Sequence, residues 1–224
     1  MPAMQTFQFG ESSQGLPIIG YKFGHSGPEI LVLGGVHGNE PEGVVAALGL
    51  LKQYSMAYTL NMQLTLVPEF NRDGVLALKR TNGRAVDLNR NLPTKDWTRD
   101  VKEEKYYPGE APNSEPENQA LVRWIEEHSP KFIISLHSWH PCLNINGACR
   151  AEAEVIRRHT GYEIKEDIGY PTPGCLGTYT GHERDIPTIT YEIERGLDPA
   201  SVLRVHVRAL VEALKTIEQR FQKN

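Results

Sequence analysis

The chain has 224 residues, of which 39% are apolar and 23% are charged, and these proportions are those of an ordinary globular protein. Its formal net charge is −4, without a run of lysine and arginine, which argues against nucleic acid as a partner. No apolar stretch approaches the roughly 20 residues needed to cross a bilayer, so we expect no membrane partner. The length suits a single domain over residues 1–224.

Cysteine usage and the N-terminal residues bear on the compartment. Residues 1–10 lack the basic start and the apolar run of a signal peptide. Cys142, Cys149 and Cys175 form no CxxC pair, and an odd number suits free thiols in a reducing compartment. We therefore expect a cytoplasmic location.

Apolar periodicity predicts strands that alternate with helices. In chain order we expect a strand at 30–35, a helix at 40–51, a strand at 63–67, a helix at 114–127, a strand at 131–136, a helix at 151–159, a strand at 187–193 and a helix at 199–221. Ser114 is expected to cap the second helix, with Glu117 at the capping-box position. This alternation favours an α/β fold with a mostly parallel sheet covered on both faces.

Two stretches show little periodicity and much Asn, Gly and Pro, namely 72–112 and 161–181. Loops of that length inside a compact domain are usually functional, so we expect both to contribute to a site.

His37 and Glu40 follow the first predicted strand, at the point where it turns into a helix. A lone HxxE is weak evidence, because His37 can be a plain loop histidine and Glu40 can favour the positive end of a helix. His137 also follows a predicted buried strand, so it can converge with the pair at one sheet edge. Two histidines and one carboxylate are typical of catalytic zinc. His140 is a rival ligand, although a surface position fits it better.

The last predicted strand places Thr190, Glu192 and Glu194 on one polar face. A carboxylate beside a metal-activated water can take its proton and pass it to a leaving amine. Spacing alone does not choose between Glu192 and Glu194.

Ordered motifs along the chain resemble those of the zinc carboxypeptidase family. They are Gln14-Gly-Leu-Pro-Ile, His37-Gly-Asn-Glu40, Asn71-Arg-Asp-Gly74, Arg80-Thr-Asn-Gly, Val86-Asp-Leu-Asn-Arg-Asn91, Ser114-Glu-Pro-Glu, Ser135-Leu-His137 and Thr190-Tyr-Glu192. The stretch 169–179 is similar to the bacterial branch of the family that acts on murein peptides. Two departures are Arg72, where the family usually has proline, and Leu92, where an aromatic residue is common.

This resemblance implies a three-layer α/β/α sandwich around a mixed, largely parallel sheet. It also implies the following roles: His37, Glu40 and His137 as ligands of one Zn2+ ion, Arg80 as the residue that stabilises the oxyanion, Asn89 and Arg90 as the pair that binds a terminal carboxylate, and Glu192 as the catalytic glutamate. Tyr179 is a candidate for the tyrosine that covers the substrate in digestive members.

The function that this resemblance implies is hydrolysis of an amide bond near a free C-terminus. The expected substrate is a murein tripeptide, cleaved at its γ-D-glutamyl–meso-diaminopimelate bond. One alternative is a zinc-dependent deacylase of N-acyl amino acids, similar to succinylglutamate desuccinylase or aspartoacylase. Another is a peptide-binding module without catalytic activity.

Overall fold

The computed structural model describes residues 4–222, and its centre is one mixed sheet of eight strands in the order β1-β2-β4-β3-β5-β8-β6-β7. The strands are β1 (Gln5–Glu11), β2 (Pro17–Phe23), β3 (Glu29–Leu33), β4 (Gln63–Val67), β5 (Phe132–Trp139), β6 (Cys142–Asn146), β7 (Glu163–Lys165) and β8 (Thr188–Glu194). Strands β4, β3, β5 and β8 run parallel to one another at the centre. Antiparallel pairing of β1 with β2, β2 with β4 and β6 with β8 makes the sheet mixed.

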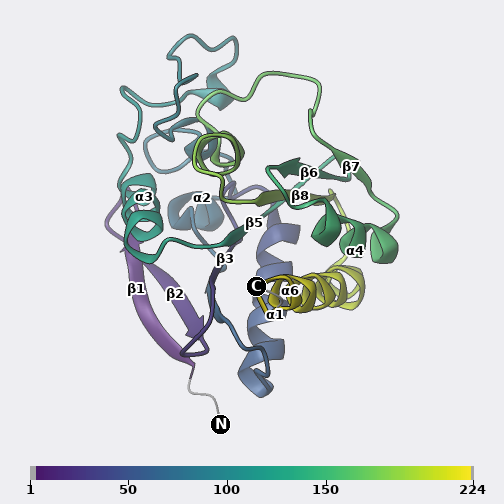
Figure 1. Ribbon diagram of the computed structural model, residues 1–224. Coiled ribbons are helices and arrows are strands. Elements are labelled where there is room, and N and C mark those ends of the chain that lie inside the picture. The colour runs from purple at the N-terminus through teal and green to yellow at the C-terminus, as the bar shows by residue number, and fades with distance from the viewer. Residues whose placement is uncertain (1–3, 223–224) are drawn as a thin grey trace.

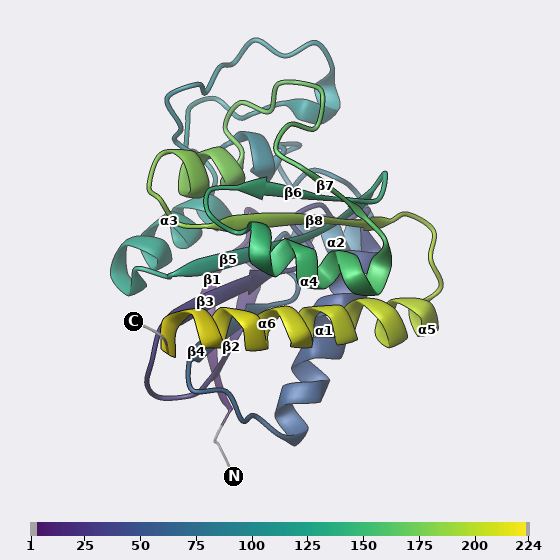
Figure 2. The ribbon, with the colours of Figure 1, turned by 45° about the vertical axis from the view of Figure 1, so that its right-hand side comes forward.

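Helices cover both faces of this sheet (Figures 1 and 2). They are α1 (Pro41–Met56), α2 (Arg72–Ala77), α3 (Pro116–His128), α4 (Arg150–Thr160), α5 (Pro199–Ser201) and α6 (Val207–Gln222). Helices α1, α4 and α6 share one apolar core with the sheet, and α3 shares the other. The expected three-layer α/β/α arrangement is confirmed. Within residues 4–222, no helix is both long and apolar enough to span a membrane.

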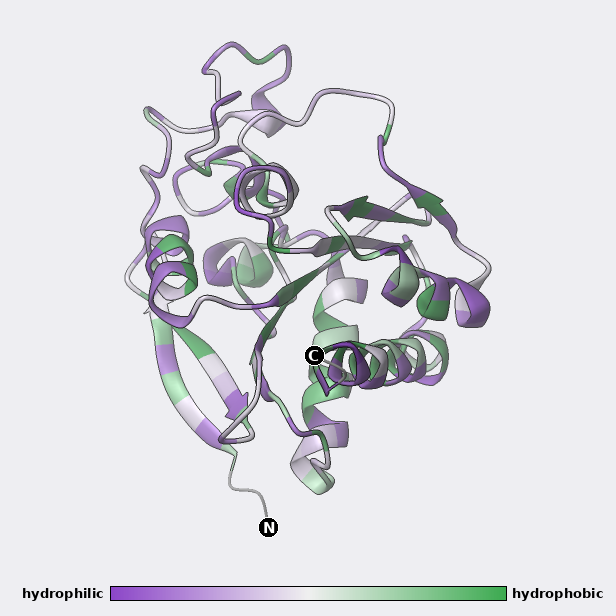
Figure 3. Cartoon of the chain, in the orientation of Figure 1, coloured by the Kyte–Doolittle hydropathy of each residue, from purple (hydrophilic) through white to green (hydrophobic). Residues whose placement is uncertain are grey.

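The central strand β3 is buried on both sides, as its continuous apolar sequence predicts. Ile30 and Val32 face the core under α1 and α6, whereas Leu31 and Leu33 face the core under α3. Figure 3 shows the matching pattern in the helices, because α3, α4 and α6 each carry one hydrophobic and one hydrophilic side.

The sequence pattern did not reveal the N-terminal hairpin of β1 and β2, nor β6. The residues of β1 are mostly exposed or half-buried, since it is an edge strand, so they carry little apolar alternation. These antiparallel additions explain why spacing alone predicted a parallel sheet whereas the family resemblance implied a mixed one.

The start of α3 differs from the predicted capping box. Its N-cap is Glu115, and the hydroxyl of Ser114 donates to Glu115 Oε1 at 2.8 Å. The Glu117 carboxylate accepts a hydrogen bond from Ser13 N at 2.8 Å. Glu117 therefore ties the N-terminal segment to the helix instead of capping it.

The stretch 72–112 is not irregular throughout, because it begins with α2. Asn71 caps this helix by accepting from Gly74 N at 2.9 Å. Arg72 then occupies the first helical position, where the backbone N–H has no helical partner and proline fits equally well. The exchange of the family's usual proline for Arg72 is thus compatible with the turn.

The segment after α2 is ordered by the buried amide of Asn91. Its Nδ2 atom donates to Pro108 O at 2.7 Å, Ala111 O at 3.0 Å and Ser114 Oγ at 3.0 Å. Its Oδ1 atom accepts from Glu115 N at 3.2 Å. Because Asn91 directly follows Arg90, these bonds also hold the backbone of the cavity wall described below.

We predict that Asn91→Ala lowers the free energy of unfolding by about 2–3 kcal/mol, because several buried polar groups lose their partner. Chemical denaturation measures the change. Asn61→Ala, at an exposed position outside regular structure, is the matched control and should change stability by less than about 0.5 kcal/mol. Equal stability of the two variants would contradict a structural role for the Asn91 amide.

Candidate active site

The sheet brings His37, Glu40 and His137 together at the carboxyl ends of its parallel strands. His37 lies in the turn after β3, and Glu40 is the N-cap of α1. His137 lies inside β5, which continues to Trp139 instead of ending before the histidine as predicted. One potential ligand atom from each residue lies within 4.8 Å of the others, and all three residues are buried.

In each of the two histidines, one ring nitrogen faces into the cluster and the other faces out of it. Their Nδ1 atoms are 3.1 Å apart, and each lies 3.0 Å from a carboxylate oxygen of Glu40. The Nε2 atoms face away, toward Asp87 Oδ1 at 3.0 Å and Ser135 Oγ at 2.9 Å. Histidines that bind metal usually hold their second ring nitrogen in such a bond. The donor set therefore fits Zn2+, with both Nδ1 atoms and Glu40 as ligands.

The rival histidine does not join the cluster. His140 is exposed, and its ring lies against Trp139 with the centroids 4.7 Å apart.

Asp87 connects this cluster to Arg80, although the sequence pattern did not single it out. The carboxylate is fully buried, and Oδ2 accepts from Arg80 Nε at 2.9 Å and lies 2.8 Å from Arg80 Nη2. Burial alone would raise the pKa of Asp87, but His37 and the Arg80 guanidinium bring it well below its usual value. Asp87 thus remains ionised and orients both His37 and Arg80.

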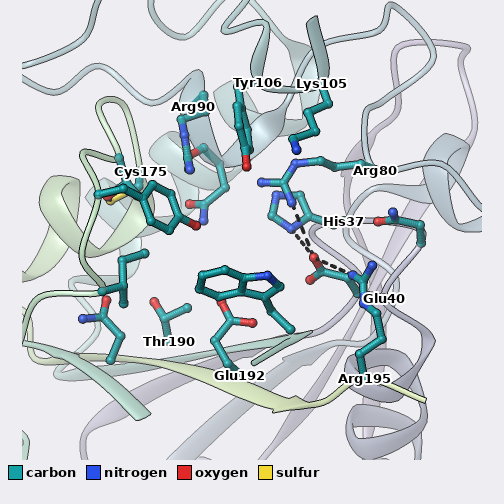
Figure 4. A pocket seen from close by; sticks show the side chains of 17 residues that line it. His37, Glu40, Arg80, Arg90, Lys105, Tyr106, Cys175, Thr190, Glu192 and Arg195 are labelled. Atoms are coloured by element: carbon teal, nitrogen blue, oxygen red, sulfur yellow. Dashed lines mark hydrogen bonds and ion pairs between the residues drawn. The ribbon is translucent and has the colours of Figure 1, made fainter. Parts of the chain in front are cut away.

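A cavity opens beside the cluster, and Arg80, Asn89, Arg90 and Glu192 all line it (Figure 4). Arg80 Nη1 lies 3.5 Å from Glu40 Oε1, next to the cluster. Asn89 Oδ1 accepts from Leu176 N at 2.9 Å, and the side-chain nitrogen of Asn89 has no hydrogen-bond partner in the part of the chain that the structure describes.

The backbone of Arg90 lies in close contact with the aperiodic stretch 161–181. Gly174 has a φ of +72°, and a Cβ atom there would meet Arg90 O at 2.1 Å, so only glycine fits. The Arg90 guanidinium lies 5.3 Å from the centre of the Tyr106 ring. The loop and Tyr106 thus enclose Arg90 at one end of the cavity.

Strand register places Glu192 beside a histidine of the cluster, because His137 pairs with Glu192 in the parallel β5–β8 ladder. Side chains at paired positions leave the same face of a sheet. Glu192 Oε2 is buried and has no hydrogen-bond partner among residues 4–222. Burial raises the pKa of Glu192 to about 7, with His137 opposing and Glu40 adding to the shift. Glu194 is exposed and does not line the cavity.

Tyr179 does not lie in the cavity, so the prediction that it covers a substrate is wrong. It is fully buried in the core beneath α3, because the π-helical turn Thr178–His182 directs its ring inward. Tyr170 lines the cavity instead and packs edge-to-face on Trp139, with ring centroids 5.7 Å apart. Its sequence signals were its place in the aperiodic stretch 161–181 and in the family-like stretch 169–179, neither of which singled out Tyr170.

A family model described as zinc carboxypeptidase matches residues 2–163. The chain belongs to the zinc carboxypeptidase family. Family membership and the His-Glu-His cluster together define a zinc-dependent hydrolase, which argues against a binding module without activity.

Two curated relatives are murein peptide amidases A. That of Vibrio campbellii is 30% identical over 201 residues, which cover 83% of this chain and 77% of that protein. That of Escherichia coli K12 is 29% identical over 187 residues, covering 78% and 75%. A crystal structure of murein-tripeptide amidase from Escherichia coli O157 superposes with a TM-score of 0.79 at 25% identity, covering 96% of this chain and 93% of that one. Carboxypeptidase A from Helicoverpa armigera shares the fold, with a TM-score of 0.82 at 18% identity, covering 98% and 68%.

We predict that Glu192→Gln stabilises the metal-free protein at high pH. The pKa of this carboxyl is 4.5 in its ordinary, unfolded environment and about 7 in the folded protein. As the pH rises, the unfolded state therefore loses the proton first, and the carboxyl destabilises the fold increasingly between pH 4.5 and about pH 7. Denaturation of chelator-treated protein should show about 2–3 kcal/mol more stabilisation at about pH 8 than at about pH 5.

Glu194→Gln is the control on the same strand, and it should show no such pH dependence because Glu194 is exposed. A Glu192→Gln effect of the same size at both pH values would contradict the burial of this carboxyl.

We also predict that Asp87→Asn weakens zinc binding about 10- to 100-fold, because the amide holds His37 Nε2 and Arg80 less firmly than the carboxylate does. Competition with a chromogenic chelator measures the affinity. Asp100→Asn, at an exposed position, is the control. Unchanged affinity in Asp87→Asn would exclude Asp87 as a support of the metal ligand.

Proposed function

We propose that His37, Glu40 and His137 bind one Zn2+ ion and that the enzyme hydrolyses an amide bond next to a C-terminal residue. The observation that carries this proposal is the placement of three functions on one cavity: the His-Glu-His cluster, the enclosed cation of Arg90 and the unpartnered carboxylate of Glu192. When bound, zinc activates water and polarises the carbonyl of the substrate.

Arg90 and Asn89 bind and orient the substrate. The guanidinium of Arg90 forms a fork that matches a carboxylate, and Asn89 adds a donor because Leu176 N already satisfies its oxygen. A C-terminal carboxylate held here lets the preceding amide bond reach the cluster, since Arg90, Glu192 and Glu40 line the same cavity.

Glu192 and Arg80 carry the proton transfer and the charge stabilisation. Glu192 takes a proton from the attacking water and passes it to the leaving amine. Arg80, held by the ionised Asp87, donates to the oxygen that becomes negative, an effect of about 3–4 kcal/mol where single oxyanion donors have been removed.

The proposed substrate is a murein tripeptide, cleaved between γ-D-glutamate and meso-diaminopimelate. The murein peptide amidases among the relatives support this choice. The cavity supports it as well, because its lining includes the polar side chains of Asn144, Thr172 and Thr190. Such a lining suits the polar side chain of diaminopimelate better than an aromatic one.

We place the reaction in the cytoplasm. Cys142, Cys149 and Cys175 are all free thiols, as expected for a protein of a reducing compartment.

Mass spectrometry of L-Ala-γ-D-Glu-meso-diaminopimelate incubated with zinc-loaded protein tests this proposal. The wild type should release free diaminopimelate, and Glu192→Gln should be slower by about 100- to 10,000-fold because it lacks the proton carrier. An intact tripeptide, together with release of acetate or succinate from N-acyl amino acids, would indicate the deacylase instead.

A further inference from the structure

A third arginine of the cavity, Arg195, has no role in the proposed chemistry. It directly follows β8, and its backbone N–H donates to Trp139 O at 3.2 Å, so it lies next to the cluster edge of the sheet. It lines the cavity, and its side chain is 46% exposed. A half-exposed cation at the mouth of an active site can meet a charged group of the substrate.

The guanidinium of Arg195 is held in a defined orientation. Its Nε and Nη2 atoms donate to Ser138 O at 3.3 and 2.9 Å, and Nη2 lies 3.3 Å from Glu40 Oε1. Within residues 4–222, Nη1 has no hydrogen-bond partner, so one arm of the guanidinium remains available for a ligand.

A buried carboxylate contacts both the residue that accepts from Arg195 and the residue that follows Arg195. Glu42 accepts from Ser138 Oγ at 2.6 Å and from Gly196 N at 2.7 Å. The acceptor of Arg195 and the turn that carries it are therefore both tied to α1. Such preorganisation reduces the entropy lost when a ligand binds.

The other cations of this side of the cavity already have carboxylate partners. Arg80 is paired with Asp87, and Lys105 Nζ lies 2.8 Å from Glu103 Oε2. The carboxylate near Arg195 is Glu40, whose oxygens also face two histidines and Arg80. The positive charge of Arg195 is therefore the least compensated one at this end.

The position of Arg195 indicates that it would contact the acyl part of the substrate. In Figure 4, Arg90 and Thr190 lie on one side of Glu192, and Arg195 lies on the other side with Glu40. Arg90 is the proposed site of the C-terminal carboxylate on the leaving-group side. A group that contacts Arg195 thus belongs to the residue that supplies the scissile carbonyl.

A γ-linked glutamyl residue carries a charge in this region that most residues lack. The carbon of its free α-carboxylate lies four bonds from the scissile carbonyl carbon, the same separation as the side-chain carboxylate of an α-linked glutamate. We propose that Arg195 binds this α-carboxylate and selects acyl groups that carry a carboxylate at this separation. This inference rests on the proposed function.

Two peptides that differ only in this charge test the inference, namely L-Ala-γ-D-Glu-meso-diaminopimelate and its derivative with the glutamyl α-carboxylate converted to a carboxamide. The wild type should prefer the carboxylate form about 10- to 100-fold in kcat/KM, as expected for hydrogen bonds to charged groups. Arg195→Gln should reduce this preference to less than about threefold, and Arg195→Lys should keep part of it because the charge remains.

Arg208→Gln, on an exposed position of α6 outside the cavity, is the matched control and should keep the full preference. Zinc content and zinc affinity are measured for every variant. Equal loss of activity on both peptides in Arg195→Gln, together with weaker zinc binding, would show that Arg195 only supports Glu40 and would overturn the inference.

Binding separates this inference from the proposed reaction. Calorimetric dissociation constants of both peptides are measured in the slow Glu192→Gln protein and in the double variant that also carries Arg195→Gln. A preference for the carboxylate form that disappears in the double variant supports the role of Arg195, even if the wild type releases no diaminopimelate and the proposed reaction fails. Cleavage of both peptides without preference would leave the reaction standing and overturn the inference alone.

Discussion

The active-site arrangement depends on one buried ion pair, that of Asp87 with Arg80. A carboxylate with no solvent access is stable in its charged form only when cations and donors surround it. Here Arg80 and the ring of His37 supply them, from a loop and from the end of a strand. Because the same carboxylate contacts both, a displacement of Asp87 would disturb His37 and Arg80 together.

The cavity combines side chains from the two long loops with side chains from the central sheet. The cluster residues and Glu192 lie on or next to central strands. In contrast, Arg80 and Tyr170 come from loops, and Asn89 and Arg90 come from the short 3-10 turn Leu88–Arg90. Buried amides and one glycine give these segments a defined conformation. The strands thus fix the His-Glu-His cluster and Glu192, and the loops contribute the side chains that we propose to bind a substrate.

Much of the fold and the metal cluster could be predicted, because their signals are local. The buried strands β3, β4, β5 and β8 carry continuous apolar sequences, and their carboxyl ends place His37 and His137 at one edge. Tyr179 illustrates what could not be predicted, since residues 161–181 have no periodicity and the direction of a side chain there depends on distant contacts. The role of Asp87 could not be predicted for a related reason: its partners are His37 and Arg80, and no spacing rule connects all three.

The histidines of the His-Glu-His cluster are far apart in the sequence, so zinc can bind all three residues only after the sheet has formed. His137 is 100 residues from His37 and reaches it only when β5 pairs with β3 in the correct register. A slip of one residue would turn His137 to the other face of the sheet, because side chains alternate between the two faces of a strand. A ligand that binds only the native state stabilises it by mass action. Zinc supply in the cell therefore influences how much of this chain persists in folded form, and not only how fast the enzyme works.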